Sequence, residues 1–397
     1  MINQKMLELG TKRSAIRELF EYGRTRKAEI GAEGVFDFSI GNPSVAAPQC
    51  LTDALRDLID GTDPVTLHGY TSAQGDPAVR TAVAKAEAER SGEYVDPNLI
   101  YMTCGAAASL TITLHALCNA GDEVIVLAPY FPEYRVFAEK AGAVVKEVPC
   151  LPLTFQLDFA ALSDAITPRT KAVILNSPNN PTGAVIPAAD LQILGNLLRE
   201  KEAFLGTEIF LICDEPYRAL VYDGVSVPYV PSFYSRTVVC YSYSKALSLP
   251  GERIGYILIP PVLPDGETVY AAVCGAGRAL GFVCAPSLMQ YAVARCTNAV
   301  AEASVYEENR GILSRGLSEI GYSITPPDGA FYLFVKALEE DAVAFCQRAK
   351  EYELLLVPSD SFGVRGYVRI SYCVSTQQIR NSLPAFRALY ESYRKKV

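Results

Sequence analysis

Histidine is scarce in this chain, and the side chains that usually build metal sites or hydrolase triads are not grouped. Among 397 residues there are only two histidines, His68 and His115, far apart in the sequence. The 11 cysteines are scattered and include no C-x-x-C pair. A zinc site or a Ser-His-Asp hydrolase is therefore not expected. Because the cysteine number is odd and several lie in apolar segments, we interpret them as reduced thiols of a cytoplasmic protein.

Long apolar runs and blocks of basic residues are also missing. No segment approaches the length of a membrane span, and the polar N-terminal segment lacks the apolar run of a secretion signal. The 36 basic and 44 acidic residues give a net charge of −8. Because nucleic acids and anionic membranes attract basic patches, neither is an expected partner.

The length and composition are typical of a large folded protein. With 397 residues, 50% of them hydrophobic, the chain can bury a large core and form two domains. From about Ala47 onward, short apolar segments alternate with segments of helical periodicity. This alternation predicts an α/β fold with a mostly parallel sheet flanked by helices. The expected strands are 100–103, 123–128, 144–148, 171–175, 208–213, 237–241 and 254–259.

After Pro286 the pattern changes. A long helical stretch covers residues 287–321, and short strands and helices follow it. We interpret this part as a smaller α+β domain. Because the N-terminal helix precedes the α/β pattern, we expect it to join the smaller domain. The predicted division is a large domain at 46–286 and a small domain made of 1–45 with 287–397.

Lys245 is the residue whose surroundings point most clearly to chemistry. It follows Ser242 and Ser244, and Arg253 lies eight residues further on. Lysine forms Schiff bases with carbonyl compounds. Two hydroxyls and a guanidinium form a natural receptor for a phosphate group. The segment therefore suggests a lysine that carries an aldehyde cofactor, with neighbours that hold the cofactor's phosphate.

An acidic residue, Asp214, ends the apolar segment Ile209–Cys213. A carboxylate in that position is costly to desolvate unless it meets a cation, and a pyridinium nitrogen is one such partner. The alternative is an aspartate that caps a helix. Tyr217, three residues later, could reach the phenolic oxygen of the same ring.

Further candidates lie at other strand ends, where open α/β sheets bind ligands. The backbone of Gly105, Ala106 and Ala107 opens a helix and could meet a phosphate. Tyr130 could stack on a flat cofactor. Asn180, in the loop 176–183, could donate to a ring oxygen and a substrate carboxylate. The simpler alternatives are an alanine-rich helix start, a packing tyrosine and a loop that only turns the chain.

Arg369 stands in a β-branched, aromatic strand, Tyr367–Ser371, where a guanidinium needs an anionic partner. A carboxylate bound by both arms of the fork is the best match. That carboxylate could belong to a substrate or to a structural Asp or Glu, and the residues alone favour the structural choice.

These elements, in this order, closely resemble the pyridoxal-phosphate-dependent aminotransferases of fold type I, class I/II (aspartate aminotransferase-like). The resemblance covers nearly the whole chain, from Ile40–Pro43 to Arg369, and its most specific motifs are Asn179–Gly183, Asp214–Tyr217 and Ser242–Lys245. It implies a seven-stranded type of large-domain sheet. It also implies an enzyme that moves an amino group between an α-amino acid and a 2-oxo acid.

The resemblance implies a role for each candidate residue. Lys245 would form the Schiff base and move a proton between the substrate Cα and the cofactor C4′, and Asp214 would pair with the pyridine nitrogen. The cofactor ring would be contacted by Tyr130, Asn180 and Tyr217, and its phosphate by Gly105, Ala106, Ala107, Ser242, Ser244 and Arg253. The substrate α-carboxylate would be bound by Gly41, Asn180 and Arg369. Tyr70 would reach the phosphate in the neighbouring subunit of a homodimer.

The side-chain preference is left open by one departure from the family pattern. Some aspartate-preferring relatives carry a lysine at the position corresponding to Ala107, and alanine cannot bind a second carboxylate. Arg218 or Arg278 could supply that cation instead. Phe331 and Tyr332 could line the pocket and favour an apolar or aromatic donor.

Other functions remain as alternatives. A β-lyase of the cysteine-conjugate or cystathionine type would use the same fold and the same catalytic residues. A nucleotide-binding oxidoreductase is disfavoured because no G-x-G-x-x-G follows the first strand. A non-catalytic sensor of this fold would need an added DNA-binding domain, for which we expect no room, and it would not need Lys245.

Overall fold

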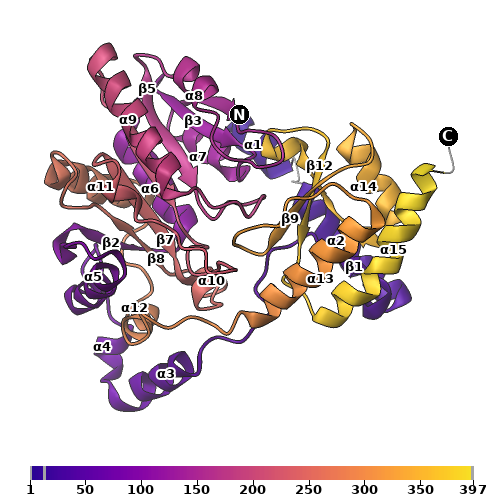
Figure 1. The fold of residues 1–397 in the computed structure, drawn as a ribbon. Helices are drawn as coiled ribbons and strands as arrows, with labels where there is room; N and C mark the ends of the chain where they lie inside the picture. The colour runs from indigo at the N-terminus through magenta and orange to yellow at the C-terminus, as the bar shows by residue number, and fades with distance from the viewer. Residues whose placement is uncertain (1, 12–14, 395–397) are drawn as a thin grey trace.

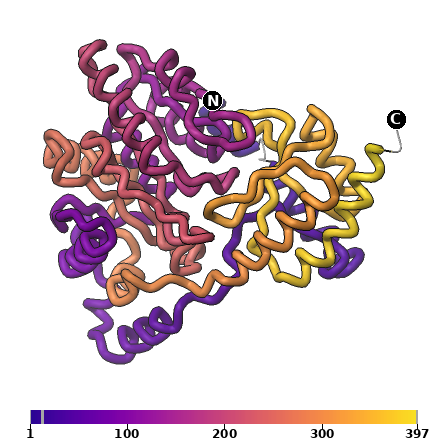
Figure 2. The backbone as a smooth tube through the Cα atoms, viewed as in Figure 1, coloured from indigo at the N-terminus to yellow at the C-terminus, as the bar shows by residue number. Residues whose placement is uncertain are grey.

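A sheet of seven strands forms the centre of the larger part of the protein, whose computed structural model describes residues 2–11 and 15–394 (Figures 1 and 2). The strand order is β2-β8-β7-β6-β5-β3-β4, and only β8 runs antiparallel to the others. The strands are β2 (Ile100–Thr103), β3 (Glu123–Ala128), β4 (Val144–Pro149), β5 (Thr170–Asn176), β6 (Phe210–Asp214), β7 (Thr237–Ser242) and β8 (Gly255–Leu258). The predicted α/β fold with a mostly parallel sheet is confirmed.

Helices cover both faces of this sheet, so the central strands are buried throughout. In β6, Phe210 and Ile212 pack on the face that carries α6 and α11, while Leu211 and Cys213 pack on the face that carries α8 and α9. The alternation follows from the two-residue period of a strand. The helices of this part are α3 (Gln49–Gly61), α4 (Pro64–His68), α5 (Pro77–Ser91), α6 (Ala106–Leu117), α7 (Glu133–Lys140), α8 (Phe159–Ala165), α9 (Ala188–Leu205), α10 (Tyr243–Ala246), α11 (Gly266–Leu280) and α12 (Ser287–Ala294).

The second part combines the two ends of the chain (Figure 1). Its antiparallel sheet has the order β11-β12-β9, and β1 pairs in parallel with β10, which joins the N-terminal segment to the C-terminal one. The strands are β1 (Phe36–Asp37), β9 (Tyr332–Lys336), β10 (Leu354–Leu355), β11 (Val357–Pro358) and β12 (Tyr367–Ser371). The helices are α1 (Gln4–Thr11), α2 (Ala15–Ile30), α13 (Ser304–Ile320), α14 (Ala342–Lys350) and α15 (Thr376–Arg394). Among the residues described, no helix could cross a membrane.

The division into two domains stays a proposal, and the packing of α12 bears on its boundary. Met289, Ala292 and Val293 of α12 join the hydrophobic cluster of α3, α5 and the large sheet. Figure 1 shows α12 beside α4, with an extended connection to α13. Because the buried face of α12 packs against the large part, we place the boundary after residue 294 instead of after 286.

Gly255 allows β8 to approach two neighbouring segments closely. A Cβ atom there would lie 2.2 Å from the Tyr241 carbonyl oxygen and 3.0 Å from the Gly105 Cα. We predict that Gly255→Ala lowers the free energy of unfolding by about 2 kcal/mol, because backbone atoms must shift. Gly275→Ala, in the exposed interior of α11 with no atom nearby, should raise it by about 0.5 kcal/mol. Urea unfolding of both variants tests this, and equal midpoints would contradict it.

Candidate active site

A cavity of about 350 Å³ lies where several parallel strands reach their carboxyl ends. That volume is large enough for a small ligand. It is lined by Ile16, Ile40, Gly41, Ala106, Ala107, Leu110, Phe131, Asn176, Asn180, Asp214, Pro216, Tyr217, Ser242, Ser244, Lys245, Pro250, Arg253, Tyr332 and Arg369. The structure therefore brings together most of the residues predicted from sequence. Of the residues assigned to the cofactor or to the substrate carboxylate, Gly105, Tyr130 and Tyr70 do not line it.

Lys245 points its amino group at the N-terminal segment. The Nζ atom donates a hydrogen bond to the Gly41 carbonyl oxygen at 2.8 Å, and the Phe331 ring centre lies 5.2 Å away. Burial lowers the pKa of Lys245 to about 8; Cys373 opposes this shift, and Arg369 adds to it. An amine with that pKa is partly neutral near physiological pH, which makes it a competent nucleophile.

Asp214 is a buried carboxylate, and only one of its two oxygens accepts a hydrogen bond from another described residue. Its Oδ2 accepts a hydrogen bond from the Tyr134 hydroxyl at 2.5 Å, and Asn176 Nδ2 holds its backbone oxygen at 2.8 Å. The Oδ1 atom is buried without a partner. Burial raises the pKa of Asp214 to about 7, against the Tyr134 hydrogen bond and with a smaller contribution from Glu215. A ring nitrogen that carries a proton would satisfy this oxygen.

Ser242, Ser244 and Arg253 form a cup next to the start of α6. The two serine hydroxyls lie 2.8 Å apart, and Arg253 Nη1 donates to Ser244 Oγ at 3.3 Å. Gly105 has a φ of +84°, and a Cβ atom there would lie 2.8 Å from Arg253 Nη2. The backbone N–H groups of Ala106 and the next residues are free at this helix start. This combination suits a phosphate group.

Arg369 is a buried cation with no carboxylate partner within the described ranges. Its Nη1 donates to Asn180 Oδ1 at 3.1 Å and its Nη2 to the Ser39 carbonyl oxygen at 2.7 Å, while its Nε is unpaired. Burial lowers the pKa of Arg369, which nevertheless stays charged at any working pH. The structural Asp or Glu that the sequence favoured as partner is therefore not there. The guanidinium lines the cavity without a carboxylate from the described residues beside it.

Tyr217 and Tyr332 meet in the wall of the cavity. Their hydroxyls lie 2.9 Å apart. A Cβ atom at Gly41 would fall 2.0 Å from the Tyr332 hydroxyl, so this close approach requires glycine. Phe331, which the sequence also offered as a pocket residue, is fully buried and does not line the cavity.

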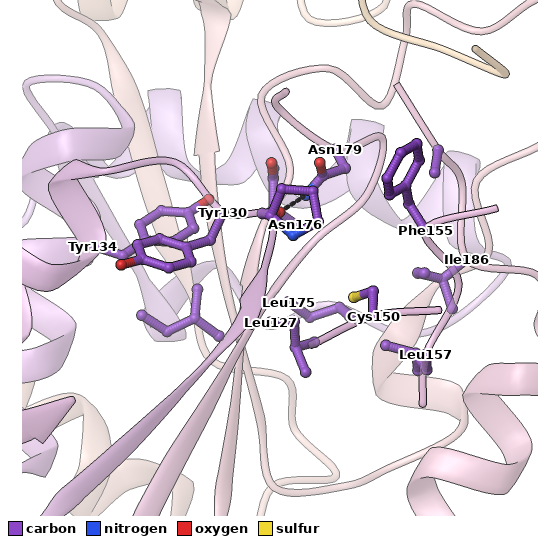
Figure 3. A pocket seen from close by; sticks show the side chains of 13 residues that line it. Leu127, Tyr130, Tyr134, Cys150, Phe155, Leu157, Leu175, Asn176, Asn179 and Ile186 are labelled. Atoms are coloured by element: carbon purple, nitrogen blue, oxygen red, sulfur yellow. Dashed lines mark hydrogen bonds between the residues drawn. The ribbon is translucent and has the colours of Figure 1, made fainter. Parts of the chain in front are cut away.

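Phe131 lines the cavity, whereas Tyr130, the residue expected to stack on a flat cofactor, does not. The Tyr130 ring lines a separate small cavity with Tyr134 and Phe155 (Figure 3), and its hydroxyl donates to Glu147 Oε1 at 2.6 Å. A buried tyrosine seeks a partner for its hydroxyl, whereas phenylalanine needs none. That difference is the signal in the sequence that favours Phe131 for the cavity wall.

Two further predicted groups lie outside the cavity of this chain. Tyr70 is 98% exposed. Arg278 is exposed on α11, and Arg218 is buried against Glu87 and Glu215, so neither supplies the cavity with a cation for a side-chain carboxylate. Ile16, which does line it, carries no sequence signal because its position depends on how α2 packs.

Comparison with known proteins gives a consistent family. Residues 33–386 match "Aminotransferase class I and II". The aspartate/prephenate aminotransferase of Thermus thermophilus is 32% identical, over 90% of this chain and 92% of that protein. A solved amino transferase from Eubacterium rectale is 53% identical with a TM-score of 0.97, covering 99% of both chains. The Thermus thermophilus aspartate aminotransferase solved with maleate is 28% identical with a TM-score of 0.86, covering 98% of this chain and 99% of that one.

The raised pKa of Asp214 gives a stability prediction for the ligand-free protein. The folded value of about 7 exceeds the ordinary 3.8, so folding favours the protonated form. The stabilisation that protonated Asp214 gives the folded state is complete below pH 3.8 and is lost as the pH rises through 7. We predict that Asp214→Asn raises the free energy of unfolding at pH 8 by up to roughly 4 kcal/mol.

Urea unfolding of wild type and Asp214→Asn at pH 5 and pH 8 measures this. The stability gain of the variant should grow with pH. A variant that is less stable than wild type at pH 8 would contradict the burial of an ionised, unpartnered carboxylate.

Proposed function

The chain belongs to the class I and II aminotransferases and is a transaminase, and we propose that its cofactor is pyridoxal 5′-phosphate, bound at Lys245. The observation that carries this proposal is the buried, unpartnered Oδ1 of Asp214 in the same cavity as a lysine with a pKa of about 8. A protonated pyridine nitrogen fits the carboxylate, and an aldehyde fits the amine.

Several residues would hold the cofactor. Asp214 would keep the ring nitrogen protonated, and Phe131 would take the stacking role first assigned to Tyr130. The phosphate would bind in the cup of Gly105, Ala106, Ala107, Ser242, Ser244 and Arg253, and the ring oxygen would accept from Asn180 and Tyr217. When bound, this group withdraws electrons and thereby stabilises the carbanion formed at the substrate Cα.

Lys245 has two tasks in this proposal. Its Nζ would hold the aldehyde covalently, with loss of water; once the substrate's amino group had replaced it, the freed amine would take the proton from the substrate Cα and return it at C4′. A pKa of about 8 suits a base that must both accept and give up a proton near neutral pH. The nearby guanidiniums of Arg369 and Arg253 help to keep that pKa low.

The substrates are an α-amino acid and a 2-oxo acid, and both carry an α-carboxylate. Arg369 is the group that we assign to this carboxylate, with Asn180 and the backbone at Gly41 beside it. The two-armed guanidinium fits a carboxylate in a fixed orientation. No observation favours the β-lyase alternative.

We also propose a cytoplasmic homodimer in which Tyr70 reaches the phosphate of the neighbouring subunit. The ring of Tyr70 is 98% exposed, and Val65 in α4 is 80% exposed. Both side chains are therefore accessible to a second copy of the chain. All the cysteines are free thiols, which supports a reducing compartment.

The proposal is tested by the absorbance spectrum of the protein with pyridoxal phosphate, before and after single amino acids are added. Transamination converts the lysine-linked form to the amine form of the cofactor, and a 2-oxo acid reverses the change. Release of pyruvate and ammonia with an unchanged cofactor spectrum would instead indicate a lyase.

Lys245→Ala should remove the lysine-linked absorbance band altogether, because among the described residues that line the cavity only Lys245 carries an amino group. Spectra of the variant incubated with pyridoxal phosphate measure this. Lys336→Ala, at an exposed strand end, is the control and should keep the band. A band that persists in Lys245→Ala would refute the assignment.

Arg369→Leu should raise the KM for every amino acid substrate by about 100-fold, because a charged hydrogen-bonding partner of the carboxylate is lost. The exposed Arg365 provides a control four residues away, and Arg365→Leu should leave KM unchanged. Steady-state kinetics with two different amino acids measure both variants. An unchanged KM and kcat in Arg369→Leu would show that the carboxylate binds elsewhere.

A further inference from the structure

Behind the cavity, the turn that follows β6 rests on a cluster of four charged side chains, of which three are buried and one, Arg90, is partly exposed. Arg218 Nη1 donates to Glu215 Oε2 at 3.1 Å, and Arg218 Nη2 donates to Glu87 Oε1. Arg90 Nη2 donates to Glu87 Oε2 at 2.9 Å. Glu87 and Arg90 come from α5. The cluster contains two guanidiniums and two carboxylates, so its charges balance.

Two tyrosines complete the surroundings of Arg218. The Tyr256 hydroxyl accepts from Arg218 Nη2 at 2.8 Å and donates to Glu87 Oε1 at 2.7 Å. The Arg218 guanidinium lies 3.8 Å from the centre of the Tyr241 ring. The Arg218 and Glu87 side chains are only 8% and 4% exposed. Burial opposes ionisation of Glu87, but Arg218 and Arg90 outweigh it and keep its pKa below the usual value.

The turn presents its side chains to two sides. Asp214 and Tyr217 line the cavity, whereas Glu215 and Arg218 do not line it and bond to the cluster. The two cavity residues and the two cluster residues all lie within the five residues 214–218. Arg218 and Glu215 are the backbone neighbours of Tyr217 and Asp214, so the bonds of the cluster hold the same turn that carries the two cavity residues.

We propose that Arg218, held by Glu87, is a positioning residue for transamination: it fixes where the Tyr217 hydroxyl and the Asp214 carboxylate lie in the cavity. This role rests on the proposed function of the cavity. A buried ion pair is a poor source of stability compared with apolar residues of the same volume. What a guanidinium provides is a rigid, planar fork that binds two carboxylates in one orientation.

Three variants test the role, and they are given in order of decreasing structural change. Arg218→Lys keeps the charge but loses the fork, Glu87→Gln removes one charge, and Tyr256→Phe removes only the bridging hydroxyl. The purified variants are loaded with pyridoxal phosphate. The measurements are the dissociation constant of the cofactor, the pH midpoint of its absorbance change, kcat/KM and the thermal midpoint.

We expect Arg218→Lys and Glu87→Gln to raise the cofactor dissociation constant about tenfold. Their kcat/KM should fall by about 10- to 100-fold, as misplacement of catalytic groups does. The pH midpoint of the bound cofactor should shift, because Asp214 and Tyr217 set its ionisation. Tyr256→Phe should change the same quantities in the same direction by less.

Arg236 supplies a matched control. It also bridges two glutamates, Glu202 at 3.1 Å and Glu208 at 3.0 Å, but it precedes β7 and so lies at the sheet edge away from the cavity. Arg236→Lys should lower the thermal midpoint and leave the pH midpoint and the cofactor dissociation constant as in wild type.

The inference is overturned if the cluster variants behave like Arg236→Lys, losing stability alone. If the two charge variants do not fold, Tyr256→Phe decides, and unchanged cofactor properties in that variant overturn the inference. Wild type that binds no cofactor would instead be a failure of the proposed function. The two failures are therefore distinguishable.

Discussion

The buried carboxylate of Asp214 is the constraint on which the site depends. A strand of the large sheet carries it into the protein interior, where one oxygen is bonded to Tyr134 and the other has no partner. When ionised, such a carboxylate destabilises the folded protein unless a cation in the cavity pairs with it. Arg369 carries the opposite charge. Its buried guanidinium has an unpaired Nε and no carboxylate partner among the described residues, so it requires an anion. A ligand with a protonated ring and a carboxylate-bearing substrate would satisfy both.

The N-terminal segment connects the two parts of the protein across this cavity. The Gly41 carbonyl holds Lys245 of the large sheet region, and the Ser39 carbonyl holds Arg369 of β12. The Ser371 N–H also donates to Phe38. Lys245 and Arg369 are therefore both hydrogen-bonded to the segment 39–41. The distance between the two side chains depends on how each part of the protein packs against this segment.

Much of this arrangement can be predicted from the sequence, because the carboxyl ends of parallel strands meet at one edge of a sheet. That rule brings Asp214, Ser242 and Asn180 together without further information. It cannot choose between Tyr130 and Phe131, since that choice depends on the hydrogen bond of the Tyr130 hydroxyl to Glu147 in β4. Nor can it place Ile16, whose approach to the cavity comes from the packing of separate parts of the chain.

The most direct test of the central claim is chemical trapping of the cofactor on its lysine. The protein is incubated with pyridoxal phosphate, reduced with borohydride, digested and mapped by mass spectrometry. The account predicts one modified residue per chain, at Lys245, and a lower yield of that modification at limiting cofactor when Asp214 is replaced by alanine. Modification spread over surface lysines, or none at Lys245, would contradict it.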